Sequence, residues 1–196
     1  MITQRKVSIA IEEAGRAFQT CWESLRIIRA ANKESLSADH ILEFQPRLAK
    51  AIHGLGEMHR AVKSEARETV NRKSFLRPNR FKTRMRILRK YEDALNEAIR
   101  VGKAIGDGFA WLFYQGESAL LAKHLQHSEI THPPGGIGGR GECRFITDLR
   151  VVNGHLVLYH GITSILRLGD VSLVDLKAFK VTGIGELKSD EPGDGT

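Results

Sequence analysis

The stretch that decides the expected fold lies near the C-terminal end of the chain. It reads Arg167-Leu168-Gly169-Asp170, then fifteen residues, then Glu186-Leu187-Lys188-Ser189. The segment between is typical of two strands, so we expect Asp170 to open one strand and Glu186-Leu187-Lys188 to close the next. Residues two apart on a strand share a face, so Glu186 and Lys188 point the same way. If the chain reverses around Ala178, Asp170 falls opposite Glu186 on that face.

Two carboxylates and a lysine in one cluster suit a divalent cation. Burying carboxylates together is costly unless a cation or hydrogen bonds compensate. Mg²⁺ takes oxygen ligands, keeps several waters and often uses only one or two carboxylates plus a phosphate. The pattern therefore predicts Asp170 and Glu186 as metal ligands and Lys188 as the group that positions a water or stabilises developing charge. The alternative, which the sequence leaves open, is a turn aspartate beside an exposed edge-strand pair.

These residues resemble the PD-(D/E)xK nuclease superfamily, whose fold is called restriction-endonuclease-like. The resemblance covers residues 109–189, and Gly169 stands where the family has proline. It implies a core of a helix, three strands, a helix and a strand. It also implies phosphodiester hydrolysis with Mg²⁺ (or Mn²⁺) bound by Asp170 and Glu186 and with Lys188 assisting. Many members carry a further acid on the preceding helix; Glu117 and Glu142 are candidates, and Glu142 is preferred because it is nearer in the chain.

The sequence given stops eight residues after Lys188, before the second helix and last strand of that core. Three interpretations follow. The chain is a fragment of a longer protein, its core is completed in another way, or the match is coincidental.

The first half of the sequence predicts long helices. Apolar residues spaced by three and four form stripes over residues 7–28, 41–66 and 81–102, and the third stripe could continue through Phe113. The nearly heptad spacing favours a helical bundle or an antiparallel coiled coil. Such stripes are also typical of a packing scaffold or of a dimer interface.

After Gln126 the pattern changes. The Gly- and Pro-rich residues 132–141 exclude regular structure, and Asn153-Gly154 is a turn signal. We expect a short helix and then strand-like segments, over residues 142–150, 156–159, 164–168, 171–174 and 181–188. The expected fold is therefore α+β, with a helical region at 1–105, a small restriction-endonuclease-like α/β core, complete or truncated, at 106–189, and a frayed tail at 190–196.

A basic segment lies within the helical region. Residues 72–90 hold nine Lys or Arg and no acid, with Phe75 and Phe81 between the charges. Cations on a helix start and its preceding loop can contact successive phosphates. A charge run can also be a solvated face or attach to a membrane surface. The residues predicted to bind nucleic acid are Arg80, Lys82, Arg84, Arg86, Arg89 and Lys90, with Arg140 of the glycine-rich loop.

Composition agrees with a polyanionic partner. The 196 residues carry a net charge of +7, which favours nucleic acid or an anionic membrane face. No apolar run is long enough for a transmembrane helix, and two lone cysteines, Cys21 and Cys143, favour the reducing cytoplasm. We expect a cytoplasmic metal-dependent nuclease acting on DNA, with homodimerisation through the helices as an option. The alternatives are a non-catalytic nucleic-acid-binding protein and a helical protein-interaction module.

Overall fold

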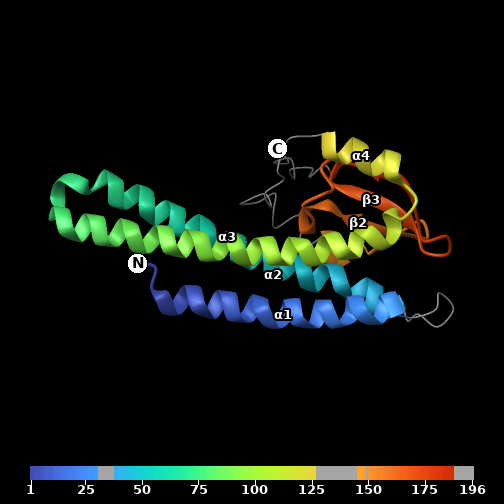
Figure 1. Ribbon diagram of the computed structural model, residues 1–196, viewed down its shortest axis with the longest axis horizontal. Coiled ribbons are helices and arrows are strands. Elements are labelled where there is room, and N and C mark those ends of the chain that lie inside the picture. The colour runs from blue at the N-terminus through green and yellow to red at the C-terminus, as the bar shows by residue number, and fades with distance from the viewer. Residues whose placement is uncertain (31–37, 127–144, 149, 188–196) are drawn as a thin grey trace, which may run out of the picture.

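The computed structural model describes residues 1–30, 38–126, 145–148 and 150–187 (Figure 1). In this part of the chain, three long helices run side by side, and a small antiparallel sheet lies against one end of them. The helices are α1 (Gln4–Ala30), α2 (Ala38–Asn71), α3 (Pro78–Tyr114) and the short α4 (Ser118–Gln126). The α+β class is confirmed. None of these described helices has a stretch that is both long and apolar enough to span a bilayer.

The apolar stripe on α1 packs as its spacing predicts. Its buried residues are Val7, Ala14, Phe18, Cys21, Leu25 and Ile28. The stripe meets α3 at Gly102, where an added Cβ would lie 2.6 Å from Cζ of Phe18. A larger residue at this crossing would therefore force the Phe18 ring to move from its place in the core.

Helices α2 and α3 form a long hairpin. The short 3₁₀ turn η1 (Lys73–Phe75) connects them, and α3 begins with Pro78, whose missing N–H costs nothing at a helix start. Helix α3 then continues without interruption across the expected domain boundary at residue 105. The long third stripe, including its extension through Phe113, is confirmed.

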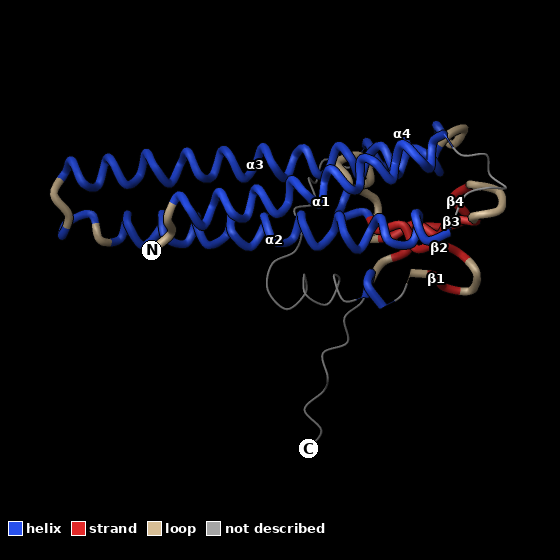
Figure 2. The backbone as a smooth tube through the Cα atoms, turned by 90° about the horizontal axis from the view of Figure 1, so that it is seen from below, coloured by secondary structure: helices blue, strands red, loops and turns tan. Residues whose placement is uncertain are grey.

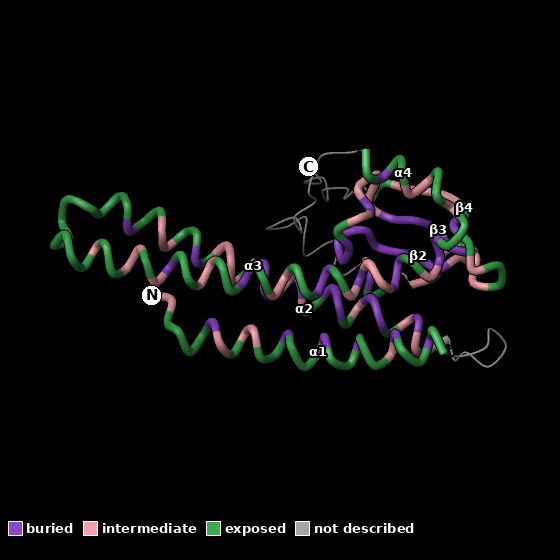
Figure 3. The backbone as a smooth tube through the Cα atoms, in the orientation of Figure 1, coloured by how far each residue is buried: buried purple, intermediate pink, exposed green. Residues whose placement is uncertain are grey.

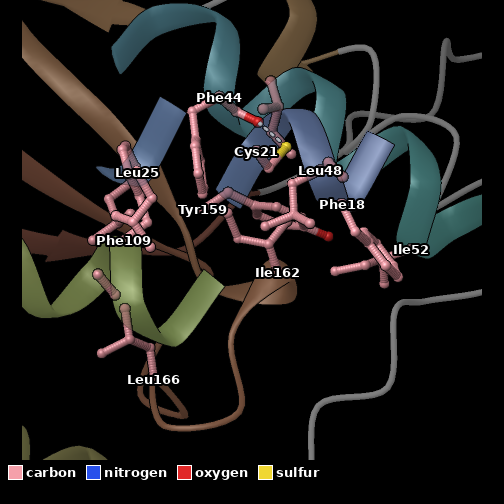
Figure 4. Close-up of a cluster of buried hydrophobic side chains, with 14 of the residues drawn as sticks. Phe18, Cys21, Leu25, Phe44, Leu48, Ile52, Phe109, Tyr159, Ile162 and Leu166 are labelled. Carbon is pink, nitrogen blue, oxygen red and sulfur yellow. Dashed lines mark hydrogen bonds between the residues drawn. The ribbon is translucent and has the colours of Figure 1, made fainter. Parts of the chain in front are cut away.

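The helices and the strands share one hydrophobic core. Phe44 of α2 and Phe109 of α3 stack with ring centroids 4.1 Å apart. Tyr159 and Ile162, from the strand region, pack into the same cluster (Figure 4). At Gly106, an added Cβ would lie 2.0 Å from the carbonyl oxygen of Ile162. The backbone of α3 therefore touches the strand region directly, which a larger residue would prevent.

The sheet in the described part of the chain is a meander in the order β1-β2-β3-β4 (Figure 2). The strands are β1 (Val151–Val152), β2 (His155–Tyr159), β3 (Val171–Asp175) and β4 (Lys180–Gly185). Asn153 and Gly154 join β1 to β2 with φ angles of 50° and 79°, as a type I′ turn requires. The predicted turn is confirmed. Figure 3 shows that the central strands are largely buried.

The expected strand over residues 164–168 is wrong. Tyr159 is followed by the 3₁₀ turn η2 (His160–Ile162) and then by irregular backbone up to β3. The carboxylate of Asp107 on α3 accepts hydrogen bonds from the N–H groups of Ser164 (2.6 Å) and Ile165 (3.2 Å). These N–H groups are thereby satisfied by a helix and not by a neighbouring strand. Of the short helix expected over residues 142–150, residues 145–148 are helical.

Helix α2 also completes the hydrogen bonding of β2. The buried Gln45 amide donates from Nε2 to the carbonyl of Val157 (2.7 Å) and accepts at Oε1 from the N–H of Tyr159 (2.8 Å). Strand β1 is too short to reach these positions, since it pairs only with His155 and Leu156. A single side chain on the helix therefore replaces a strand neighbour and holds the sheet against the bundle.

Candidate functional site

The β3–β4 hairpin brings Asp170 and Glu186 to one end of the sheet. Asp170 directly precedes β3 and Glu186 directly follows β4. The pairing of Val171 with Gly185 makes the two acidic residues neighbours across the hairpin. The expected register is present at this end, and it shifts by one residue beyond Leu173, at a bulge. The expected strand over residues 181–188 is shorter in the structure, because β4 ends at Gly185 and Glu186 and Leu187 are not in a strand. The two carboxylates predicted to act together therefore lie at the same strand ends.

Asp170 is held firmly by its neighbours. Its N–H donates to the carbonyl of Gly185 and its own carbonyl accepts from the N–H of His160, both at 2.9 Å. Its Oδ2 accepts from the N–H of Leu187 at 2.8 Å. The described residues offer no donor to the other oxygen, Oδ1. The half-buried carboxylate thus has one oxygen that no described residue engages, and the next residue across the hairpin is the exposed Glu186.

The backbone conformation at position 169 explains why glycine and not proline precedes Asp170. The φ of Gly169 is +68°, and an added Cβ would lie 2.8 Å from the carbonyl oxygen of Gly185. Proline is restricted to φ near −65° and cannot adopt this conformation. The local backbone before Asp170 therefore requires glycine for two independent reasons.

Several predicted site residues lie outside the described part of the chain. These are Lys188, Glu142 and Arg140, together with Cys143 and the tail at 190–196. Within the described residues, no group of three or more His, Cys, Asp or Glu side chains is arranged to hold a metal ion. What this part supplies is the pair Asp170 and Glu186, and two carboxylates are a number that Mg²⁺ accepts when water and phosphate complete its shell.

The second candidate acid, Glu117, does not join this pair. It lies in the turn between α3 and α4, and its Oε1 is 2.9 Å from Nζ of Lys180. Lys180 begins β4, whereas Glu186 follows the end of that strand. At about 3.4 Å per residue, the two ends of β4 are about 17 Å apart. Glu117 therefore pairs with a lysine at the far end of the hairpin.

A buried polar cluster lies behind Asp170, and the sequence alone did not reveal it. Tyr114, His124, His160 and Ser172 come from α3, α4, η2 and β3, and each is at most 1% exposed. The hydroxyl of Tyr114 lies 2.9 Å from Nε2 of His124 and 2.7 Å from Oγ of Ser172. Oγ of Ser172 lies 2.6 Å from Nε2 of His160. No spacing in the sequence links these four positions, although His160 directly follows an apolar strand.

The donors and acceptors of this cluster form a single chain of hydrogen bonds from His124 through Tyr114 and Ser172 to His160. Nδ1 of His124 accepts from the N–H groups of Arg167 (3.1 Å) and Leu168 (3.0 Å), so its proton is on Nε2 and is donated to Tyr114. Nδ1 of His160 lies 2.9 Å from the carbonyl of Gly169, so it carries a proton and Nε2 accepts from Ser172. Tyr114 must then donate to Ser172. Both imidazoles are neutral in this arrangement.

Burial agrees with these protonation states. It lowers the pKa of His160 to about 4 and raises the pKa of Tyr114. Ser172 and His160 are within hydrogen-bonding distance, as in a hydrolase, but Ser172 is 0% exposed, and a nucleophile must reach its substrate. The cluster instead binds the backbone of residues 167–169, directly before Asp170. It is a support that positions the hairpin end.

The basic segment lies at the opposite end of the helical hairpin. It covers the end of α2, η1 and the start of α3, far from the sheet in Figure 1. At 1.5 Å per residue, α3 places Lys90 about 36 Å and Arg80 about 51 Å from Tyr114. The exposed predicted residues there are Arg80, Lys82, Arg86, Arg89 and Lys90. Any polyanion that contacts both ends must therefore be long.

Arg84 differs from the other predicted cations. Its Nε donates to Oε1 of Glu65 at 3.0 Å, and its Nη2 donates to the carbonyl of Ile2 at 2.8 Å. The other oxygen of Glu65 accepts from the N–H of Ile2 at 2.5 Å. Hydrogen bonds from Arg84 and Ile2 hold the pKa of the Glu65 carboxyl below its ordinary value, against the opposing effect of burial. Arg84 thus joins α2, α3 and the N-terminus, and it has little capacity left for phosphate.

No protein-family model matches this chain, and no curated protein and no solved structure matches it either. The function must therefore be argued from the residues and geometry described above.

Proposed function

We propose that this chain is a metal-dependent phosphodiesterase acting on nucleic acid, most simply a DNA nuclease. The observation that carries the proposal is the placement of Asp170 and Glu186 side by side at one end of the β3–β4 hairpin, with Oδ1 of Asp170 not engaged by any described residue. The donor set fits Mg²⁺ or Mn²⁺, which prefer carboxylate oxygens. When bound, the ion would polarise the phosphate and lower the pKa of a bound water.

We assign the remaining roles to Lys188 and Glu142. Lys188 follows Glu186 by two positions in the sequence, and its ammonium would act at the phosphate held by the two carboxylates and the ion. There it would stabilise negative charge that develops on the phosphate. Glu142 would supply the third acid. The backbone bonds of Asp170 to Gly185 and His160 hold its carboxylate in a fixed position before substrate arrives.

The order of elements supports a restriction-endonuclease-like core as the finer proposal. Helices α3 and α4 precede the four described strands. In this proposal β2, β3 and β4 correspond to the three strands that open that core, and the two-residue β1 is an addition to it. The exposed cations of the basic segment and the net charge of +7 support a polyanionic substrate.

A second candidate is a non-catalytic nucleic-acid-binding protein. The bond from the N–H of Leu187 to Oδ2 of Asp170 favours it, because a carboxylate that closes a strand end is useful without any metal. In that case the cations would bind nucleic acid and the hairpin end would serve only the fold.

Nicking of supercoiled plasmid by the purified chain, with Mg²⁺, with Mn²⁺ and with EDTA, tests the proposal. We expect cleavage only with a divalent ion, and a loss of at least about 100-fold for Asp170→Asn, Glu186→Gln and Lys188→Ala. Asp175→Asn is the matched control. Asp175 ends the strand that Asp170 precedes, and its Oδ1 accepts from the N–H of Lys177 at 2.8 Å, a bond that asparagine retains.

Calorimetric titration with Mn²⁺ separates the two candidates. Binding that Asp170→Asn and Glu186→Gln abolish, and that Asp175→Asn leaves unchanged, supports the metal site. Plasmid binding without metal binding or cleavage would favour the non-catalytic candidate.

A further inference from the structure

The turn between α2 and α3 presents an aromatic ring to solvent. Phe75, the last residue of η1, is 87% exposed. The exposure of this ring is not the result of a loose turn, because backbone hydrogen bonds hold the turn together. The N–H of Phe75 donates to the carbonyl of Arg72 (3.0 Å), and the N–H of Leu76 donates to the carbonyl of Lys73 (3.3 Å). Leu76 is half-buried, so the turn covers one apolar residue and exposes the other.

A cation–π contact ties this turn to the following helix. The ammonium of Lys73 lies 5.6 Å from the ring centre of Phe81, in the first turns of α3. Such a contact holds the backbone of η1 against α3. Phe75 is therefore presented from an ordered turn, with little conformational freedom to lose when a partner binds.

Exposed cations flank Phe75 in the sequence and continue along α3. We call the following set the basic tip: Phe75 with Arg72, Lys73, Arg77, Arg80, Lys82, Arg86, Arg89 and Lys90. In the described part of the chain, none of these cations forms an ion pair with a carboxylate. Arg84 shows the contrast, because Glu65 is within its reach and binds it. The basic tip therefore carries uncompensated positive charge.

The cations of α3 form a track that leads away from Phe75. Lys82, Arg86 and Lys90 follow one another at intervals of four residues, so they lie on one face about 6 Å apart along the axis. All three are exposed, whereas Leu88 between them is buried on the opposite side. Figure 3 shows this end of the hairpin as mostly exposed. A chain of phosphates can lie along such a track.

We propose that the basic tip binds unpaired nucleotides, with Phe75 stacked on a base and the cations of α3 on the phosphates that follow. Surfaces that hold single strands combine these two features, a positive track and an aromatic ring. In a duplex the bases already stack on one another, so an exposed ring must first unstack a base step, which costs a few kcal/mol. An unpaired base is open to stacking without that cost. This inference rests on the nucleic-acid partner of the proposed function and specifies which form of nucleic acid the tip recognises.

An anionic membrane is the alternative partner of the basic tip, because an aromatic ring with neighbouring cations is also suited to a lipid surface. Membrane-surface helices bury a continuous apolar face. The basic tip instead offers a single aromatic ring, and its neighbour Leu76 is half-buried against the protein. Charge complementarity with a phosphate chain and stacking on a base therefore account for the tip better than insertion into a bilayer.

Fluorescence anisotropy with a labelled 20-nucleotide DNA, single-stranded and as the matching duplex, tests the proposal. Measurements in EDTA prevent cleavage. We expect Phe75→Ala to weaken single-strand binding about ten-fold and duplex binding less than two-fold. Phe75→Trp keeps an aromatic face and should bind single strands as tightly as the unmodified chain. Phe75→Leu keeps apolar area but loses the aromatic face, so its single-strand affinity should be as low as that of Phe75→Ala. Removing an 87% exposed ring leaves the core intact.

The charge track gives a second readout. The triple variant Lys82→Ala, Arg86→Ala, Lys90→Ala should weaken single-strand and duplex binding alike and reduce the salt dependence of both. Trp111→Ala removes a half-exposed aromatic ring at the other end of α3 and is the matched control, with no change in either affinity.

The outcomes distinguish this inference from the proposed function. If Phe75→Ala changes neither affinity, or both equally, while the triple variant still weakens binding, the stacking role is wrong and the nucleic-acid partner stands. If the unmodified chain binds no DNA at low salt, the proposed function itself fails. Phe75-dependent binding to vesicles of phosphatidylserine, without DNA binding, would replace the inference with a membrane partner.

Discussion

The hydroxyl of Ser172 donates to Nε2 of His160 across 2.6 Å, and this bond joins the start of β3 to the turn that follows β2. His160 in turn donates from Nδ1 to the carbonyl of Gly169, one residue before Asp170. The position of the candidate metal ligand therefore depends on a neutral histidine that is buried behind it.

Stability should fall in mild acid because of His160. Its pKa is about 4 in the folded chain and near 6.5 when unfolded. The unfolded state therefore binds more protons between these values, so the stabilisation is complete above pH 6.5 and is lost as the pH falls toward 4. The loss amounts to about 3 kcal/mol. Urea unfolding at pH 7.5, 5.5 and 4.5 measures it. His160→Gln should reduce the dependence and leave the part due to His53, whose pKa burial also lowers. The control exchange His155→Gln at the β1–β2 turn should leave the dependence unchanged.

Removing the hydroxyl of Tyr114 should destabilise the fold. Tyr114→Phe leaves Nε2–H of His124 without its acceptor and Oγ of Ser172 without its donor. The expected cost is about 1–3 kcal/mol, because buried polar groups lose their partners. Urea unfolding measures this cost. Tyr91→Phe, on a half-buried tyrosine of the same helix, is the control, and an equal effect of both exchanges would contradict the role of the cluster.

The close contact of α3 with η2 predicts a large effect of one methyl group. In Gly106→Ala the new Cβ would lie 2.0 Å from the carbonyl oxygen of Ile162, and we expect a cost of about 1–3 kcal/mol. Gly54→Ala in α2 meets no atom within 4 Å and should stabilise by about 0.5–1 kcal/mol through helix propensity. The thermal midpoints of the two variants should therefore shift in opposite directions.

Substitutions of Arg84 and Arg86 should have different effects: the first should lower the stability of the fold, and the second should weaken DNA binding. Arg84→Ala removes the bonds to Glu65 and to Ile2, so it should destabilise by about 1–3 kcal/mol and leave DNA affinity nearly unchanged. Arg86→Ala removes an exposed cation, so it should weaken DNA binding, lower the salt slope by about 1 and keep the stability within about 0.5 kcal/mol. Chemical denaturation and anisotropy on both variants check the pair.

The length of α3 predicts a minimum length for a substrate that contacts both ends of the helix. Lys82 and Lys90 lie about 48 Å and 36 Å from Tyr114 along the helix, which corresponds to about 11–14 base pairs. If the tip and the hairpin end contact one molecule, the triple charge variant should slow cleavage of a 25-base-pair duplex and leave an 8-base-pair duplex unaffected. Equal slowing of both duplexes would show that the tip acts in another way.

The sequence by itself determined the elements whose signals are local. The helices follow from apolar spacing, because a helix face repeats every 3.6 residues. The Asn153-Gly154 turn follows from the left-handed backbone that these residues tolerate. The placement of Asp170 near Glu186 follows from strand alternation and one short turn.

Only the tertiary structure decided the features that depend on distant residues. Residues 164–168 are not a strand, because side chains far away in the chain bind their N–H groups. Asp107 accepts from Ser164 and Ile165, and His124 accepts from Arg167 and Leu168. Arg84 and Arg86 are alike in sequence, and the bonds of Arg84 to Glu65 and to the carbonyl of Ile2 make them different. The cluster behind Asp170 needs four elements to meet in one buried place. Such contacts have no local period or spacing, so they arise only when the chain is packed.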